Sequence, residues 1–113
     1  MKYFETRFLE KANGFLAKLD KKLARKVFYN IDLAEQTNDP QLFKKLKNEI
    51  WEFRSQYFGN QNRLLAFWDK TEPIETLVLA IYGFVKKDNK VPQKEIDKAK
   101  RIREEYFNNK KKK

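Results

Sequence analysis

Arginine, lysine and carboxylate side chains are the groups in this sequence whose types and positions suit chemistry on an anion. The chain contains no histidine and no cysteine. Their absence removes the commonest general base, the thiol nucleophile and the zinc–thiolate site. Any catalysis must therefore use lysine, arginine, tyrosine or a carboxylate, and we expect neither a metal ion nor an organic cofactor.

Two arginines and a glutamate fall on one face of a predicted hairpin. Aromatic and polar residues alternate from Trp51 to Tyr57, and an apolar run follows over residues 63–69. Between them, Gly59-Asn60 suits a two-residue turn, which pairs Phe58 with Gln61 and fixes the faces of both strands. One face is then apolar, and the other carries Glu52, Arg54, Gln56 and Arg63.

Arg54 and Arg63 form a candidate phosphate clamp. In this register they are diagonal neighbours, about 7–8 Å apart at their Cα atoms. Two guanidinium groups at that separation can grip one phosphate from two sides. The alternative is a solvated sheet face on which Glu52 and Asp69 make surface ion pairs.

Lys86 and Lys87 are a second pair of candidates, because they follow the apolar run of residues 76–82. A run that is apolar on both faces predicts a strand in the middle of a sheet, and sites often form where such a strand ends. The alternative for this pair is a charged strand end that faces water.

The elements that must position these residues predict one α+β domain. Apolar residues at helical spacing predict an α-hairpin over residues 8–18 and 21–36, with Asp20 as the cap of its second helix. Residues 3–8 are aromatic-rich and fit a short strand. Pro92 begins a last helix. We therefore expect an N-terminal helical hairpin packed on a mostly antiparallel sheet of three or four strands, followed by a C-terminal helix.

The formal net charge of +10 indicates a polyanionic partner, with a merely basic soluble surface as the alternative. Four of these charges form the run Lys110–Lys113, which we expect to be a disordered tail (110–113) after a single domain of residues 1–109. The longest apolar run, residues 77–85, is too short to span a bilayer, and no apolar signal segment follows Met1. We therefore expect a cytoplasmic protein with no membrane partner.

Three blocks of the sequence, taken together, resemble a known family. They are Lys44-Lys45-Leu46-Lys47 followed by Trp51-Glu52-Phe53-Arg54, then Arg63-Leu64-Leu65-Ala66-Phe67, then Gly83-Phe84-Val85-Lys86-Lys87 followed by Val91-Pro92. Their order and spacing resemble the RelE/ParE toxin superfamily, and most of all the HigB-like, phage-related branch of type II toxin–antitoxin systems. The likeness covers nearly the whole chain.

This resemblance implies a small RelE-like fold and a toxin that cleaves mRNA, commonly on the translating ribosome, without a metal ion. It also implies a cognate helix-turn-helix antitoxin as partner. In the family's chemistry, the ribose 2′-hydroxyl attacks the adjacent phosphate while basic side chains stabilise the transition state. The matching positions here are Arg54 and Arg63 as the clamp, Lys86 or Lys87 as acid or electrostatic stabiliser, Lys87 also as an RNA contact, and Lys45 and Lys47 as phosphate contacts.

Glu52 departs from the family's pattern, since some RNase members carry a lysine there. It is either the general base or a residue that weakens RNA binding. The C-terminal Tyr or His of some members has no match, because Tyr106 lies on an apolar stripe. Two other functions stay open: a ParE-like gyrase inhibitor that does no chemistry, and a degenerate member that only binds its antitoxin.

Overall fold

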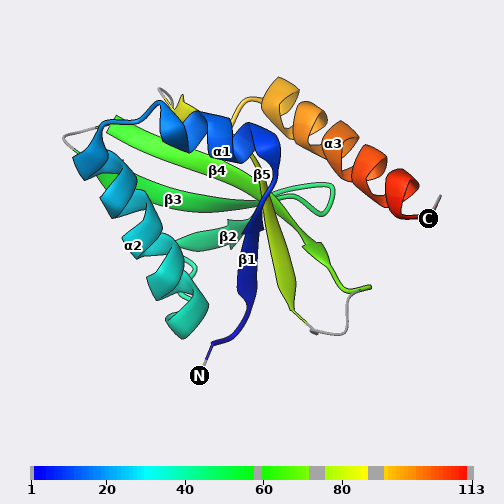
Figure 1. The fold of residues 1–113 in the computed structure, drawn as a ribbon, viewed down its shortest axis with the longest axis horizontal. Helices are drawn as coiled ribbons and strands as arrows, with labels where there is room; N and C mark the ends of the chain where they lie inside the picture. Colours follow the sequence, from blue (N-terminus) through cyan, green and yellow to red (C-terminus); the bar gives the residue numbers. More distant parts are fainter. Residues whose placement is uncertain (1, 58–59, 72–75, 87–90, 112–113) are drawn as a thin grey trace.

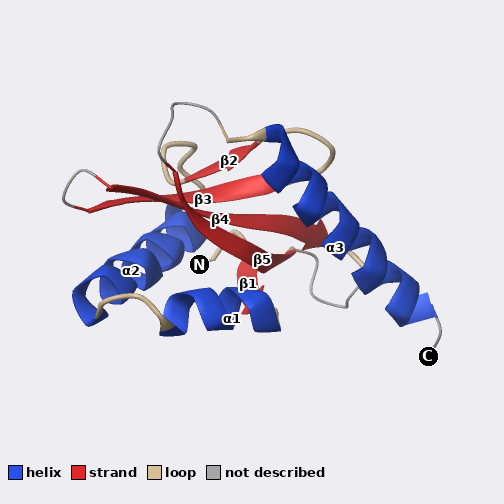
Figure 2. Cartoon of the chain, turned by 90° about the horizontal axis from the view of Figure 1, so that it is seen from above, coloured by secondary structure: helices blue, strands red, loops and turns tan. Residues whose placement is uncertain are grey.

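A five-stranded sheet runs through the molecule, with two helices on one face and a third on the other (Figures 1 and 2). The computed structural model describes residues 2–57, 60–71, 76–86 and 91–111. The elements, in chain order, are β1 (Glu5–Phe8), α1 (Glu10–Ala17), α2 (Lys21–Thr37), β2 (Phe43–Lys45), β3 (Trp51–Tyr57), β4 (Asn60–Asp69), β5 (Leu77–Lys86) and α3 (Gln93–Lys111).

The sheet has the order β1-β5-β4-β3-β2. Neighbouring strands are antiparallel except β1 and β5, which run parallel. The α+β fold with its helical hairpin, mostly antiparallel sheet and C-terminal helix is therefore confirmed. Residues 43–45 form a short edge strand, so the sheet has five strands rather than the three or four that we expected.

The helical hairpin follows the sequence closely. Asp20 caps α2 as predicted, because its carboxylate accepts a hydrogen bond from the backbone N–H of Lys22 at 3.1 Å. The helix ends at Asn38, whose backbone is left-handed with φ of 54°. Between these two ends, α2 packs against β3.

Apolar side chains fill both faces of the sheet, as two layers require. Between the sheet and α1 and α2 lies an aromatic core that includes Phe4, Phe43 and Phe53. Between the sheet and α3 lies a smaller core that includes Ile50, Leu65 and Phe67. The interior strand β5 contributes to both, because Val78 lies in the first core and Leu79 in the second. This confirms that β5 is covered on both faces.

A fully buried carboxylate fastens the C-terminal half of α3 to the end of β4. Asp69 accepts hydrogen bonds from Tyr106 Oη at 2.5 Å and from Lys110 Nζ at 2.7 Å. Asp69 therefore does not make the surface ion pair that we considered. Lys110 and Lys111 lie in the last turn of α3, so the helix includes residues assigned to the tail, and residues 112–113 lie outside the described residues.

The hairpin of β3 and β4 has a different register from the predicted one. Tyr57 pairs with Asn60 and Gln56 pairs with Gln61, so the pairing of Phe58 with Gln61 is wrong, and residues 58–59 themselves lie outside the described residues. The shift is two residues, which leaves every side chain on its predicted face because the period of a strand is two.

Within the described ranges, no helix is long and apolar enough to cross a membrane.

Candidate functional site

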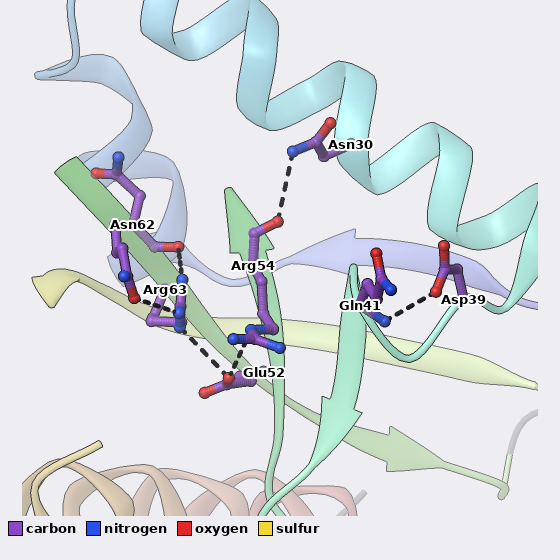
Figure 3. Close-up of polar contacts among 8 residues, drawn as sticks. Asn30, Asp39, Gln41, Glu52, Arg54, Asn62 and Arg63 are labelled. Atoms are coloured by element: carbon purple, nitrogen blue, oxygen red, sulfur yellow. Dashed lines mark hydrogen bonds and ion pairs between the residues drawn. The ribbon is translucent and has the colours of Figure 1, made fainter. Parts of the chain in front are cut away.

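Arg54 and Arg63 are direct partners across β3 and β4 rather than diagonal neighbours. Glu52 on the same face forms an ion pair with each of them: its Oε1 lies 3.4 Å from Arg54 Nε and 3.3 Å from Arg63 Nε (Figure 3). Like charges directly opposite each other destabilise a sheet. The carboxylate therefore offsets a repulsion that the observed register creates.

The two arginines differ in exposure. The Arg54 side chain is 35% exposed, whereas Arg63 is buried at 3%. Arg63 also donates hydrogen bonds to the carbonyl of Asn62 at 3.2 Å and to Gln61 Oε1 at 2.7 Å. Burial lowers the pKa of Arg63, the Glu52 carboxylate opposes that shift, and the charge of Arg54 adds to it. Arg54 is thus the arginine that a ligand reaches, and Arg63 lies behind it.

Glu52 is buried as well, at 3% exposed, and its second oxygen, Oε2, is buried without a hydrogen bond in the described part of the chain. The ion pairs with Arg54 and Arg63 exist, but Glu52 is not the exposed residue of a solvated face that we considered. Its contacts are those of a residue that holds two cations in place.

An open groove of about 530 Å³ lies beside Arg54, between α2 and the edge of β3. Arg54 and Arg63 line it from the sheet, and Lys26 lines it from α2. Asn30 joins the two walls, because its Nδ2 lies 3.4 Å from the carbonyl of Arg54 and 3.4 Å from Ser55 Oγ (Figure 3). Arg54 and Arg63 belong to the sheet face that carries Glu52 and Leu65, whereas α2 packs on the opposite face, which carries Phe53, so the groove has lining residues from both faces at the edge of β3.

Lys45 and Lys47, two of the predicted lysine sites, do not line this groove. Lys45 makes an ion pair with Glu49 at 3.6 Å, and Lys47 lies 3.5 Å from Gln93 Oε1, near the start of α3. The backbone of Lys86 pairs with Gln61, but its side chain and all of Lys87 lie outside the described residues. The two lysines at the end of β5 stay predictions.

Lys44 is a candidate that the sequence analysis did not assign to the site. It pairs with Glu52 across β2 and β3, so it lies on the same face as the two arginines, and it is exposed. The alternation of apolar Phe43 and polar Lys44 is the sequence signal for this strand. The signal is weak because the strand has only three residues. Within the described ranges, no group of three or more Asp and Glu side chains is placed to hold a metal ion.

The α+β fold, with three helices and a five-stranded, mostly antiparallel sheet, is compatible with a small RelE-like domain. The chain belongs to the family of phage-derived Gp49-like proteins (DUF891), which matches residues 14–104. This family is related to the RelE-type toxin–antitoxin proteins. No curated protein matches the chain.

Proposed function

We propose that this protein is the toxin of a type II toxin–antitoxin system, in the HigB-like branch, and that it cleaves mRNA on the translating ribosome. The observation that carries the proposal is the cross-strand pair of Arg54 and Arg63 at the wall of the groove. Family membership supports a toxin role with an antitoxin as partner. The net charge of +10 supports a polyanionic substrate.

The reaction that suits these residues is attack of a ribose 2′-oxygen on the adjacent phosphorus. The new bond joins the 2′-oxygen to phosphorus, and the bond from phosphorus to the 5′-oxygen breaks, which leaves a 2′,3′-cyclic phosphate and a 5′-hydroxyl. The 2′-hydroxyl loses one proton and the leaving oxygen gains one. Extra negative charge develops on the phosphate oxygens, where arginine donors stabilise the transition state most.

Within this scheme, we assign to Arg54 the contact with the phosphate and to Arg63 its support from behind. Glu52 acts as a positioning residue, because its carboxylate is buried between the arginines and does not face the groove. A general base must lie within hydrogen-bond reach of the proton it removes, and the buried Glu52 carboxylate does not meet this requirement for a ligand in the groove. The proton donor to the 5′-oxygen remains a prediction for Lys86 or Lys87.

A chain that binds without chemistry is the second candidate, and the ion pairs of Glu52 favour it. One carboxylate already neutralises part of the charge of both arginines. A ParE-like gyrase inhibitor or a member that only binds its antitoxin needs the fold and the basic surface but no proton transfer. In either case, an acidic antitoxin segment would bind the groove less tightly at high salt.

The test is to induce the chain alone in bacterial cells and to map the 5′ ends of mRNA. We expect growth and translation to stop and new 5′ ends to accumulate. Arg54→Ala should abolish the new ends, whereas Arg25→Ala, which removes an equal charge from an exposed position on α2 outside the groove, should not. Intact transcripts with DNA damage would indicate a gyrase inhibitor, and normal growth would indicate a chain that only binds its antitoxin.

A further inference from the structure

The groove beside Arg54 has a lining suited to more than a phosphate. Among the described residues, its cations are Lys26, Arg54 and Arg63, and none of the described residues that line it is acidic. Four side-chain amides line it as well: Asn30, Gln41, Gln56 and Gln61. The ring of Tyr29 lies in its α2 wall and is 60% exposed. Cations, amides and an exposed ring in one groove are what single-stranded RNA requires of a protein.

The edge of the sheet adds backbone groups to this lining. β2 pairs with β3 only as far as Phe53, and the N–H of Arg54 donates to the carbonyl of Leu42 at 2.8 Å. Backbone groups of an antiparallel strand alternate in direction, so the N–H and C=O of Gln56 point the same way as those of Arg54, away from β4. Gln56, a residue that lines the groove, therefore has its backbone donor and acceptor directed to the side of β3 away from β4.

We propose that this groove binds one nucleotide of single-stranded RNA, with its base against Tyr29 and its phosphate at Arg54 and Lys26. The volume of about 530 Å³ lies in the range of small-molecule sites. The Lys26 ammonium lies over one face of the Tyr29 ring, 6.0 Å from its centre, so a positive charge and an aromatic ring lie together on α2. This inference rests on the proposed function and states which part of the substrate the groove holds.

Two of the amides are assigned to the edge of the base. Asn30 Nδ2 is directed at the Arg54 carbonyl and Ser55 Oγ, and Gln61 Oε1 accepts from Arg63, so these two amides serve the protein itself. The side-chain amides of Gln41 and Gln56 are therefore the two that we assign to hydrogen bonds with the ligand. An amide offers a donor and an acceptor side by side, which is the pattern that distinguishes one base edge from another. These two residues would set which base the protein prefers.

The experiment measures binding apart from cleavage. Fluorescence anisotropy follows labelled hexamers of 2′-O-methyl RNA, which lack the attacking hydroxyl, in four forms that each carry a single base type. Tyr29→Ala is compared with Phe28→Ala. Both rings are exposed on neighbouring positions of α2, but Phe28 does not line the groove. Circular dichroism checks that both variants keep the wild-type fold.

We expect Tyr29→Ala to weaken binding about ten- to hundredfold, the worth of one stacked base, and Phe28→Ala to leave it unchanged. Gln56→Ala should reduce the difference in affinity among the four base types. Equal loss in both aromatic variants would overturn the inference, as would a wild-type protein that binds an acidic peptide and none of the four hexamers. If hexamer binding follows the prediction while mRNA stays intact in cells, the groove is retained and the nuclease proposal fails.

Discussion

Replacing Glu52 by glutamine should destabilise the fold strongly, because it leaves Arg63 buried beside Arg54 with no countercharge. At the 3.3 Å separation of Glu52 from Arg63, the Coulomb energy is about 5 kcal/mol with an effective dielectric constant of 20. Loss of one partner from a buried pair costs roughly 3–5 kcal/mol. Arg54 is a third exposed, so its ion pair adds at most about 1 kcal/mol. We expect a loss of about 3–5 kcal/mol in the free energy of unfolding.

A double-mutant cycle separates the ion pair from other effects of the substitution. Glu52→Gln, Arg63→Met and the double variant are unfolded in urea at pH 7. Fluorescence reports the transition, since Trp51 and Trp68 pack together in the aromatic core. The double variant no longer buries an unpaired charge, so its loss should be smaller than the sum of the single losses by about 2–3 kcal/mol.

The result that would refute this reasoning is a Glu52→Gln protein within about 1 kcal/mol of the wild type. It would mean that Arg63 is hydrated or that another anion neutralises it, and the arrangement of the clamp would need revision. A coupling energy near zero would have the same meaning. Raising the salt concentration is a useful control, because a buried pair responds to salt much less than an exposed one.

Two other positions give predictions about stability. Burial alone would raise the pKa of Asp69, but its hydrogen bonds, among them those from Lys110 and Tyr106, hold the pKa well below its usual range. A carboxyl with a lower pKa in the folded chain stabilises the fold above the unfolded value of about 3.9 and loses this contribution as the pH falls. The urea midpoint of Asp69→Asn should therefore lie below that of the wild type at pH 7, and the difference should shrink between pH 4 and 2; a constant difference would contradict this. In Gly83→Ala the added methyl group would overlap the Phe15 ring, so we expect a loss of about 1–3 kcal/mol in thermal unfolding, relieved by Phe15→Ala in the same chain; an unchanged melting temperature would contradict the packing.

The faces of the hairpin were predictable from sequence, but its register was not. Alternation of apolar and polar residues decides which side chains share a face, and a shift by two residues preserves that alternation. Gly59-Asn60 looked like the centre of the turn, whereas Asn60 is paired with Tyr57. The two-residue shift turned Arg54 and Arg63 from diagonal neighbours into direct partners, which is the difference between an open clamp and one that needs Glu52.

The burial of charged side chains was the other feature that could not be predicted from the sequence. Glu52 and Asp69 read as surface residues because nothing in their local pattern reveals a partner elsewhere. Asp69 is neutralised by Lys110 from the far end of the chain, and a strand pattern contains no information about a contact over that separation. The α-hairpin and the capping of α2 by Asp20 depend on neighbours in sequence, and these were predicted well.

The parallel pairing of β1 with β5 has a consequence for the order in which the molecule forms. Glu5 pairs with Leu77, so β1, the first strand of this sheet in chain order, has no strand partner until about 70 further residues exist. At about 5–20 residues per second, that takes roughly 4–14 s. During this time the aromatic core still lacks Val78 and Ala80, which β5 supplies. β5, the partner of both β1 and β4, is the last strand of this sheet to appear, so the sheet can be completed only after residues 77–86 have been synthesised.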